Sequence, residues 1–512
     1  MHPSEPTLAP VRLLRRGRVV TLSGVAPDRT LLQVLREDLH CHSVKEGCAS
    51  GDCGACTVTV AEPGEGGALQ YRAINSCIRL AHSVDGMAVW TAEDIAAPAC
   101  GPEPEQLHPA QRAMVECHGS QCGFCTPGFV MSLFTLYRQR HGAEVARAEV
   151  LHALSGNLCR CTGYRAILDA AQTMHHWPDV PVDEAEVLQK LQLLAQSGCA
   201  LEADLACNSA PAAPAAPMEP GAFYARPGTL AELLALRAAQ PQALLAAGTT
   251  DVGLWITKLH QRHARIIDLT RVAELRRLQR TDGLLRIGGA VTLADAFDAL
   301  VADRPQLAPF LDRFAGLPVR RSGTLGGNVA NGSPIGDAMP LLIALGATLV
   351  LASVRGERRL PIEDFYLAYR KTALAADEVL AAIEVPHPAP GERLRADKLS
   401  KRFEDDISAV CLVVALHTEG DTIRSARIGA GGVAAVPARA LKTEAAFAGQ
   451  PLAGATFEAA AAVLQAEFDP ISDMRASSDY RRSVLGNLLR RQWAQAQPGA
   501  AALAALRPQV QP

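Results

Sequence analysis

Short stretches of alternating apolar and polar residues characterise the first part of the chain, residues 10–95. Alternation with a period of two predicts β-strands with one buried face, here at residues 18–22, 57–60 and 71–74. Between the first two, apolar positions at helical spacing predict one amphipathic helix over residues 30–39. The pattern therefore predicts a small sheet with a helix packed against it.

The pattern changes to helical spacing over residues 105–178. Apolar runs at 129–137 and 146–154 predict two helices, and Pro127 suits the first turn of the earlier one. A proline–alanine tract follows at residues 200–220. Such a composition cannot build a core, so the tract is predicted to be a linker.

Beyond the linker the pattern is of mixed helices and strands. Residues 243–252 predict a buried strand that ends in a turn at Gly248, and residues 322–328 predict a second glycine-rich turn. Backbone amides in turns of this kind can bind a diphosphate, although both turns could equally be ordinary tight turns. Neither contains the G-x-G-x-x-G of a Rossmann unit, and the chain has no P-loop. The motifs alone do not say which nucleotide binds.

Length and composition limit the class of protein. A chain of 512 residues with 48% hydrophobic and 4% aromatic content predicts three or four globular domains. The net charge of −3 gives no basic footprint for a polyanion, so nucleic acid is not an expected partner. Arginines near the N-terminus are followed by no apolar segment, and no run long enough to span a membrane occurs. We therefore expect a soluble, cytoplasmic protein.

Four of the 14 cysteines follow the plant-type C-x4-C-x2-C spacing with a fourth further on, at Cys48, Cys53, Cys56 and Cys77. This spacing is typical of a [2Fe–2S] cluster, and the residues between the ligands are small or glycine, as a tight loop requires. A zinc ribbon or a set of disulfides is the alternative. Zinc ribbons favour two separated CxxC pairs, which a loop of three cysteines does not match.

A second set of cysteines consists of Cys122 and Cys125 followed by Cys159 and Cys161. Four thiolates in a CxxC plus CxC arrangement can hold another [2Fe–2S] cluster, and zinc is the alternative. A c-type haem is excluded because threonine follows each CxxC where histidine is required. The remaining cysteines are expected to be free thiols: Cys41, Cys100, Cys117, Cys199, Cys207 and Cys411.

Three motifs resemble the iron–sulfur half of the molybdenum hydroxylases, and within them the xanthine dehydrogenase group. They are the segments around Cys48–Thr57, Gln121–Gly128 and Gly156–Tyr164, in the family's order. The likeness extends over residues 10–495 and implies an α+β multidomain fold. Its implied parts are a β-grasp, plant-type ferredoxin-like [2Fe–2S] domain at 10–95, a helical [2Fe–2S] domain at 100–180, a vanillyl-alcohol-oxidase-like FAD domain at 221–392 and a small α+β C-terminal domain at 395–500.

The resemblance also implies the residues that contact FAD. Gly248 and Thr249 would lie against the diphosphate, and residues 365–371 resemble the aromatic segment near the flavin ring, with Leu367 and Ala368 departing from the family pattern. The full implied set is Leu245, Ala246, Ala247, Gly248, Thr249, Thr250, Asp251, Val252, Phe314, Thr324, Leu325, Gly326, Gly327, Asn328, Asp337, Leu380 and Lys398.

As a member of this family, the chain would carry electrons rather than activate a substrate. A molybdopterin-binding large subunit, in a heterotetramer with this one, would oxidise hypoxanthine or xanthine to urate. Gln121 and Cys159 would lie toward the pterin, so the helical cluster would accept electrons first. From there electrons would pass to the ferredoxin-like cluster, to FAD and to NAD. No residue of this chain is expected to be a catalytic acid or base.

Two other functions are compatible with the same motifs. One is the iron–sulfur and flavin part of a different molybdenum hydroxylase, acting on an aldehyde, an N-heterocycle or carbon monoxide. The other is a stand-alone flavoprotein that oxidises NADH and needs no hydroxylase partner. Fusion of the iron–sulfur and flavin parts in one chain favours the xanthine dehydrogenase group over the first alternative.

Overall fold

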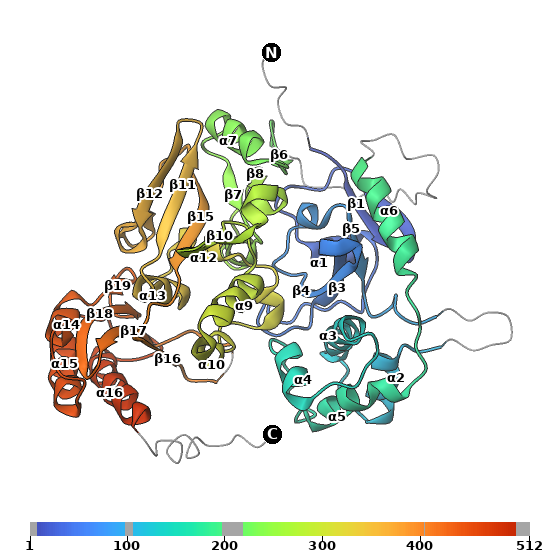
Figure 1. The fold of residues 1–512 in the computed structure, drawn as a ribbon. Helices are drawn as coiled ribbons and strands as arrows, with labels where there is room; N and C mark the ends of the chain where they lie inside the picture. The colour runs from blue at the N-terminus through green and yellow to red at the C-terminus, as the bar shows by residue number, and fades with distance from the viewer. Residues whose placement is uncertain (1–7, 98–105, 197–218, 404, 498–512) are drawn as a thin grey trace. The chain divides into compact units, whose positions relative to one another are not determined.

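The computed structural model describes residues 8–97, 106–196, 219–403 and 405–497 and divides the chain into two units (Figure 1). The first unit contains residues 1–226, 243–268 and 315–323, and the second contains 227–242, 269–314 and 324–512. Segments on the C-terminal side of the predicted linker therefore belong to both units. The linker itself, and with it Cys199 and Cys207, lies outside the described residues apart from its last two, as does Cys100.

The first unit begins with a five-stranded sheet in the order β2-β1-β5-β3-β4. Only β1 and β5 pair in parallel. The three strands predicted from alternation are present, whereas β1 and β5 lie outside the predicted segments. The strands are β1 (Val11–Arg15), β2 (Arg18–Leu22), β3 (Thr57–Pro63), β4 (Leu69–Asn75) and β5 (Met87–Trp90).

The predicted helix over residues 30–39 is present in two parts. Thr30 and Gln33 form a reciprocal capping box that starts α1 (Leu31–Gln33). The chain then widens into a π-helical segment, η1 (Val34–Asp38), which ends with the amide of Leu39 donating to the carbonyl of Val34 at 3.1 Å. The apolar face stays buried through this change because Leu31, Leu32, Val34 and Leu35 all pack in the same core.

Helices make up the next part of the first unit. The two predicted helices correspond to α3 (Thr126–Gln139) and α4 (Arg147–Ala153), and Pro127 lies in the first turn of α3 as expected. The others are α2 (Pro109–Glu116), α5 (Arg165–Thr173) and α6 (Glu184–Gln196). Short 3-10 turns occupy η2 (Glu65–Gly67), η3 (Ala81–Val84) and η4 (Met174–His176).

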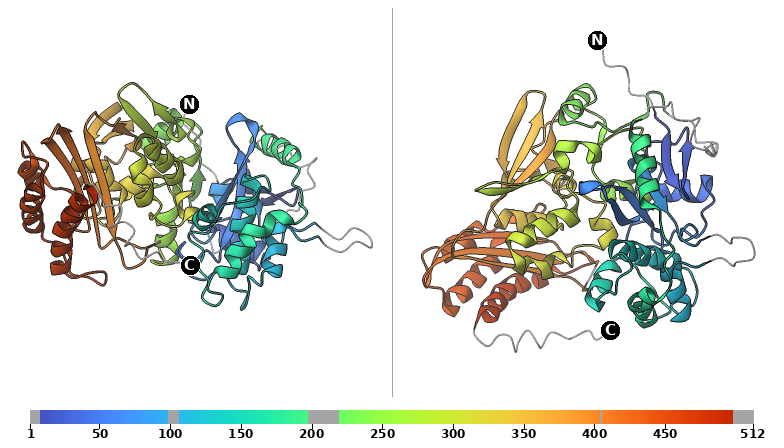
Figure 2. Two further views of the ribbon diagram at one scale, coloured as in Figure 1. Left: turned by 60° about the horizontal axis from the view of Figure 1, so that its bottom comes forward. Right: turned by 45° about the vertical axis from the view of Figure 1, so that its right-hand side comes forward.

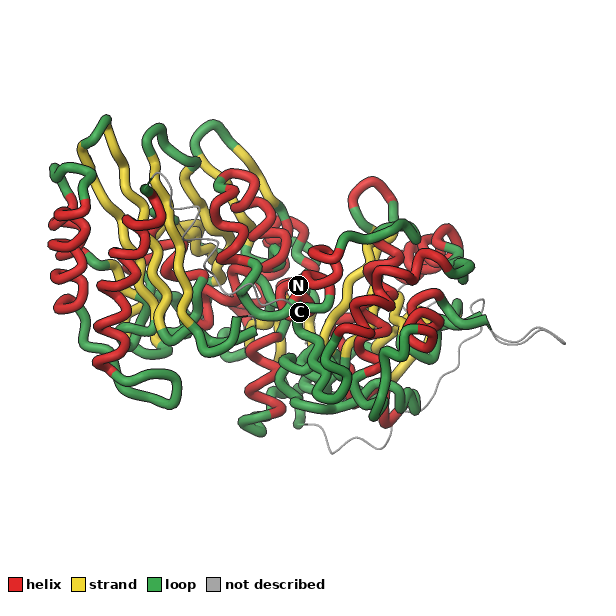
Figure 3. The backbone as a smooth tube through the Cα atoms, turned by 90° about the horizontal axis from the view of Figure 1, so that it is seen from below, coloured by secondary structure: helices red, strands yellow, loops and turns green. Residues whose placement is uncertain are grey.

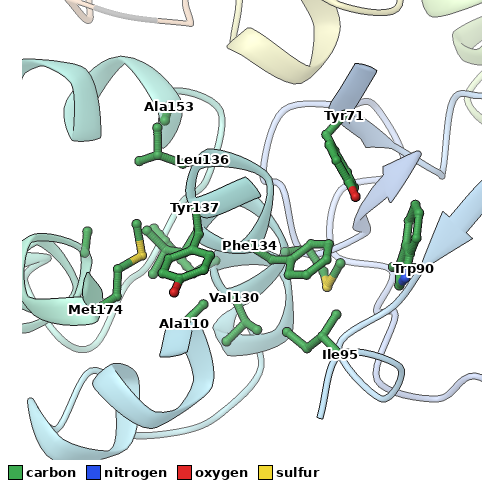
Figure 4. Close-up of a cluster of buried hydrophobic side chains, with 14 of the residues drawn as sticks. Tyr71, Trp90, Ile95, Ala110, Val130, Phe134, Leu136, Tyr137, Ala153 and Met174 are labelled. Atoms are coloured by element: carbon green, nitrogen blue, oxygen red, sulfur yellow. The ribbon is translucent and has the colours of Figure 1, made fainter. Parts of the chain in front are cut away.

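Helix α3 is the centre of this part and is buried on nearly all sides. Figure 4 shows Phe134 beside Tyr71 and Trp90 of the sheet, with Tyr137 facing the opposite group that includes Met174. The ring centroids of Phe134 and Tyr71 lie 6.3 Å apart in an edge-to-face arrangement. A helix that is apolar all round requires partners on every side, and here the sheet and the neighbouring helices supply them.

A three-stranded parallel sheet in the order β6-β8-β7 completes the first unit. It consists of β6 (Phe223–Ala225), β7 (Leu244–Ala246) and β8 (Arg265–Asp268). The first unit also contains the helices α8 (Thr250–Thr257) and α11 (Leu317–Arg320). Leu80 of the ferredoxin-like part is fully buried in one cluster with Tyr224, Ala246 and Ile266. This small sheet therefore shares a core with the first eighty residues.

The second unit contains a five-stranded antiparallel sheet in the order β12-β11-β15-β10-β9. Its strands are β9 (Leu278–Arg280), β10 (Leu284–Gly288), β11 (Thr348–Ser353), β12 (Gly356–Pro361) and β15 (Val379–Pro386), with the hairpin β13 (Tyr366–Ala368) and β14 (Lys371–Thr372) nearby in sequence. The helices are α7 (Leu230–Ala239), α9 (Leu293–Asp303), α10 (Ala308–Leu311), α12 (Leu325–Asn331) and α13 (Ala338–Ala344). The 3-10 turns are η6 (Leu269–Arg271), η7 (Ala273–Arg276), η8 (Pro305–Leu307) and η9 (Ile362–Asp364).

The end of the chain forms a second antiparallel sheet, β16-β17-β18-β19, covered by helices (Figures 1 and 2). The alternating residues Ile428 and Ala430 of β18 face α15 and α16, whereas Gly429 faces Pro340 of α13 so closely that a Cβ would lie 2.0 Å from its carbonyl oxygen. The elements are β16 (Glu392–Leu399), β17 (Val410–Glu419), β18 (Thr422–Gly431), β19 (Ala438–Arg439), α14 (Leu441–Phe447), α15 (Gly454–Glu467) and α16 (Ser478–Ala496).

Strands flanked by helices recur in both units when the backbone is coloured by secondary structure (Figure 3). Among the helices of the described residues, none combines the length and the apolar character that crossing a membrane would require.

Candidate functional site

The loop that carries the first three cysteines is wrapped around the sulfur of Cys48. The backbone amides of Ser50, Asp52 and Cys53 donate to this sulfur over 3.4, 3.3 and 3.3 Å. The loop turns this tightly because Ala49, Gly51 and Gly54 all adopt positive φ. Amides that converge on one sulfur stabilise a thiolate, which is the form of cysteine that binds metal.

Strand pairing brings Cys56, the last cysteine of this loop, together with Cys77. Cys56 precedes β3 and Cys77 follows β4, and the pairing of Thr57 with Asn75 aligns the ends of these strands. The two sulfurs are 3.2 Å apart and buried, whereas a disulfide would join them at about 2.0 Å. Hydrogen bonds with Cys53 and Cys77 lower the pKa of Cys48. All four predicted ligands of the first cluster therefore lie together.

The second set also gathers, at the start of α3 and in the loop after α4. The sulfur of Cys161 lies 3.8 Å from that of Cys159 and 3.7 Å from that of Cys122. Cys125 is the residue before α3. Its pKa is raised to about 12, mainly by burial and secondly by a hydrogen bond with Cys159. Burial also acts on Cys159, but hydrogen bonds with Thr162 outweigh it and lower the pKa of Cys159 to about 7.

Exposure differs within the second set. Cys122 and Cys161 are exposed, together with Gln121, whereas Cys159 is buried and its amide donates to the hydroxyl of Tyr164 at 2.9 Å. Cys117, close in sequence, instead has its thiol 3.5 Å from the hydroxyl of Thr173. The solvent-facing side of this set is therefore the one formed by Cys122 and Cys161.

Within each set, cysteine sulfurs lie within 4 Å of one another in the pairs Cys56–Cys77, Cys159–Cys161 and Cys122–Cys161. In the described ranges, no three His, Cys, Asp or Glu side chains converge on a position that a single metal ion could fill. A [2Fe–2S] cluster has a different requirement, because it takes four thiolates shared between two irons. Two groups of four cysteines fit that requirement, and in the first of them three amides donate to the sulfur of Cys48.

The two cysteine loops are in direct contact. The amide of Leu158 donates to the carbonyl of Cys53 at 3.0 Å, and the side chain of Asn157 donates to the carbonyl of Gly54 at 3.3 Å. Gly128 of α3 packs so closely on Gly54 that a Cβ would come within 2.1 Å of its carbonyl oxygen. Main chain next to Cys159 is thus bonded directly to a residue of the first set.

The first glycine loop lies between β7 and α8. Gly248 has φ +83°, and a Cβ there would lie 1.8 Å from the carbonyl oxygen of Ser322. Thr249 also has positive φ and precedes α8, but its side chain does not cap the helix; its hydroxyl donates instead to the carbonyl of Ile78 at 3.0 Å. A helix start without a side-chain cap leaves its first amides to other partners, and a diphosphate is a suitable one.

The second glycine segment differs from the prediction, because residues 322–328 do not form a simple turn. Thr324 accepts a hydrogen bond from the amide of Gly327 and starts α12. Gly326 packs on the main chain of Gly289, where a Cβ would come within 2.3 Å of the carbonyl oxygen. The side-chain oxygen of Asn328 is buried without a hydrogen-bond partner, so this segment offers an acceptor that a ligand group could satisfy.

Four further predicted FAD contacts belong to the second unit. Phe314 packs edge-to-face on Phe297 with centroids 5.1 Å apart. Leu380, on β15, is buried, and its carbonyl oxygen would lie 2.2 Å from a Cβ on Gly289, the same glycine that packs on Gly326. Asp337 and Lys398 form a buried ion pair at 2.9 Å. The second glycine segment and Leu380 thus both pack on Gly289. The ion pair has further partners: Ser408 donates to Asp337, and Lys398 donates to the carbonyl of Arg313.

The aromatic segment expected near the flavin ring is a hairpin, β13 and β14. Phe365 and Tyr366 are buried, and the hydroxyl of Tyr366 donates to the carbonyl of Val329 at 3.0 Å. Leu367 and Tyr369, in contrast, are 60% exposed. The half of the segment that departs from the family pattern is therefore the half that faces solvent.

Replacing Lys398 by methionine should destabilise the second unit. The substitution leaves the carboxylate of Asp337 buried without its cation, which typically costs roughly 3–5 kcal/mol of unfolding free energy. Thermal and urea unfolding measure the loss. Lys401, an exposed residue that donates to the carbonyl of Met474, is the matched control, and K401M should change stability by less than about 0.5 kcal/mol. Equal midpoints for both variants would contradict the role of the pair.

Sequence reasoning missed several residues that hold these loops. Asn157 joins the two cysteine sets, yet only its place in the quoted Gly156–Tyr164 motif could have pointed to it. Gly289 lies outside every predicted loop, and Arg79 follows a cysteine ligand without any motif of its own. Their contacts are with residues far along the chain, which local patterns do not reveal.

Comparison with known protein families assigns each part of the chain. Residues 15–81 match the model of the 2Fe-2S iron-sulfur cluster binding domain, and residues 91–172 match the [2Fe-2S] binding domain. Residues 217–388 match the FAD binding domain in molybdopterin dehydrogenase, and residues 395–496 match the CO dehydrogenase flavoprotein C-terminal domain.

Individual relatives agree with these matches. The chain is 32% identical over 92% of its length to xanthine dehydrogenase of Drosophila subobscura, and 33% identical over 90% to that of Emericella nidulans. It spans 38% and 36% of those two proteins. A solved chain of CO dehydrogenase from Oligotropha carboxidovorans is 30% identical to this chain, with a TM-score of 0.50. The match includes 55% of this chain and 100% of the CO dehydrogenase chain.

These findings confirm the predicted α+β multidomain fold and the resemblance to the molybdenum hydroxylases. The domain boundaries and the individual ligands remain predictions. The chain belongs to the molybdenum hydroxylase family and carries its two iron–sulfur domains and its FAD-binding domain.

Proposed function

We propose that this chain is the electron-transfer subunit of a xanthine dehydrogenase. In this proposal a molybdopterin-binding partner oxidises hypoxanthine or xanthine, and this chain carries the electrons to NAD. The predicted cysteine ligands hold two [2Fe–2S] clusters, and residues 245–252 and 324–328 with Phe314, Asp337, Leu380 and Lys398 hold FAD. When bound, the clusters pass single electrons and the flavin exchanges one or two, which permits hydride transfer to NAD.

A continuous line of contacts within the first unit carries the proposal. It starts at the second cysteine set, where Leu158 donates to the carbonyl of Cys53 in the first set. It continues from Cys77 through the next residue, Ile78, whose carbonyl accepts from Thr249 in the first glycine loop. Helix α8 follows Thr249, and its last residue, Thr257, donates to the carbonyl of Ala49 in the cysteine loop at 2.7 Å. These contacts support a route in which electrons pass from one cysteine set to the other and then to the predicted flavin loop.

The chain's own residues serve this function by fixing positions. Gly128 and Gly54 allow the two cysteine loops to approach more closely than any side chain would permit. Gly253 does the same for the helix after the glycine loop, because a Cβ there would lie 2.6 Å from the carbonyl oxygen of Ile78. Close approach matters because electron transfer between cofactors depends on their separation, which rigid main-chain contacts keep constant.

Exposed apolar side chains around the second cysteine set support a partner at that end. Phe124 is 45% exposed, Leu158 is 40% exposed, and Tyr164 is 37% exposed, all within a few residues of the predicted ligands. Large apolar groups gathered on a surface are typical of an interface with another protein. We propose that the molybdopterin-binding subunit contacts this surface, within a heterotetramer.

The division of labour between the subunits gives the test. The chain expressed alone and loaded with its cofactors should reduce an artificial dye with NADH, yet show no oxidation of xanthine at any substrate concentration. Addition of a molybdopterin-binding subunit should restore purine turnover, measured by urate formation and NADH production. A panel of purines, aldehydes and N-heterocycles, with carbon monoxide, identifies the substrate class.

Each other outcome favours a different function. Turnover of an aldehyde or carbon monoxide, but no purine, by the complex would replace xanthine dehydrogenase with another molybdenum hydroxylase. Dye reduction by a protein that binds no molybdopterin subunit would favour a stand-alone NADH-oxidising flavoprotein. Purine oxidation by this chain in the verified absence of molybdenum would overturn the assignment entirely.

A further inference from the structure

Arg79 is a buried arginine two residues after the predicted ligand Cys77. Only 8% of the residue is exposed. Its guanidinium donates from Nη1 to the carbonyl of Gly248 at 3.4 Å and to the carbonyl of Ser322 at 3.5 Å. Those carbonyls belong to the first glycine loop and to the residue that leads into the second glycine segment. One side chain from the ferredoxin-like part thus bonds both to the first predicted flavin loop and to Ser322, two residues before the second.

A buried guanidinium at this position lowers the stability of the fold. The Nε atom of Arg79 is buried without a hydrogen-bond partner. Buried cations with incomplete hydrogen bonding destabilise a fold, so a neutral residue of similar size would be the better choice for stability alone.

The surroundings show what the guanidinium does. The carbonyl oxygen of Ser322 would lie only 1.8 Å from a Cβ on Gly248, so the two segments of main chain are in contact. Both carbonyl oxygens lie within 3.5 Å of the same Nη1 atom, which brings the two carbonyl groups near each other. Adjacent carbonyl dipoles repel, and a donor that bonds to both removes this repulsion. Thr249 and Gly253 contact Ile78, which is bonded to Arg79 along the chain, so the same segment also supports the start of α8.

We propose that Arg79 is a positioning residue that holds the first glycine loop and the approach to the second at the spacing FAD requires. The proposal rests on the proposed FAD site. Arg79 does not contact the reacting atoms; it acts through the backbone of Gly248 and Ser322. Arg79 is separated from Cys77 only by Ile78, so it also fixes the position of the first glycine loop relative to the ferredoxin-like cluster.

The affinity for FAD, titrated by quenching of flavin fluorescence in the protein freed of flavin, tests this role. R79M removes both hydrogen bonds and should raise the Kd for FAD by roughly ten- to a hundredfold, the range for hydrogen bonds made by a charged donor. R79K keeps the charge on a shorter side chain, whose ammonium group reaches the two carbonyls less well, so it should recover only part of the affinity. Iron content and both cluster signals should stay unchanged in R79M.

Arg138 provides the matched control. It is similarly buried, at 9% exposure, and also donates to a main-chain carbonyl, that of Val180, but lies among the helices. R138M should leave the Kd for FAD unchanged even if it lowers the melting temperature. If R79M fails to fold, R79Q, which replaces the guanidinium by a neutral amide on a shorter side chain, should raise the Kd for FAD in the same direction.

The outcomes separate this inference from the proposed function. A wild-type protein that binds no FAD would overturn the proposed FAD site itself. A wild-type protein that binds FAD, with the same Kd in folded R79M, would overturn the role of Arg79 alone. An equal loss of affinity in R79M and R138M would also overturn it, because the effect would then be general destabilisation.

Discussion

Replacement of Cys53 by serine should remove one of two iron–sulfur signals and leave the other. Serine keeps the size of the side chain but offers no thiolate, and Cys53 both contacts Cys48 and supplies an amide to its sulfur. We expect the iron content to fall from about four per chain to about two, with one paramagnetic signal lost on reduction. Iron analysis and electron paramagnetic resonance of the reduced protein measure both quantities.

Cys117 is the control for this experiment. It lies near Cys122 in sequence, but its thiol contacts Thr173 instead of the second cysteine set. C117S should retain about four irons and both signals. The ligand sets would be wrong if C117S lost a signal while C53S kept both.

A valine at Gly248 should abolish FAD binding. The residue has φ +83°, which valine adopts only with strain, and its Cβ would lie 1.8 Å from the carbonyl oxygen of Ser322. Main chain cannot move aside as a flexible side chain can, so the loop must deform. We expect the purified variant to lose nearly all flavin, seen as loss of flavin absorbance after desalting, while its iron content is retained.

The strain and the clash can be separated with a second glycine. Gly86 has φ +77° and nothing within 4 Å of the position a Cβ would take. G86V therefore has the backbone strain without the collision, and it should keep its flavin. Loss of flavin in both variants to the same extent would show that instability, rather than the geometry of this loop, releases the cofactor.

Local patterns predicted the elements that local interactions determine. The capping box of Thr30 and Gln33 starts a helix where the sequence placed it, and the strand alternation around Thr57 and Tyr71 matches β3 and β4. The continuation of that helix as a π-helical segment was not predictable, because it keeps the same apolar face buried. At residues 322–328 the glycines suggested a turn, and the capping hydroxyl of Thr324 proved the stronger signal.

The grouping of the cysteines was predictable from the sequence, whereas the residues that support their loops were not. Cysteine spacing is a local property, and the structure gathers each predicted set of four. Contacts between the sets depend on residues about a hundred positions apart, such as Asn157 with Gly54, and Arg79 reaches Ser322 across 243 positions. No periodicity encodes such pairs, so they become visible only in the folded chain.

The chain passes between its two units five times, since residues 243–268 and 315–323 return to the first. The alanine- and proline-rich tract is therefore a poor place to divide the gene. A fragment that stopped there would lack β6, β7 and β8, and Leu80 would lose the partners Tyr224, Ala246 and Ile266 that shield it from water. Anyone preparing the iron–sulfur part alone, or transplanting it onto another flavoprotein, would have to carry residues 219–226 and the two returning segments along or rebuild the surface they cover.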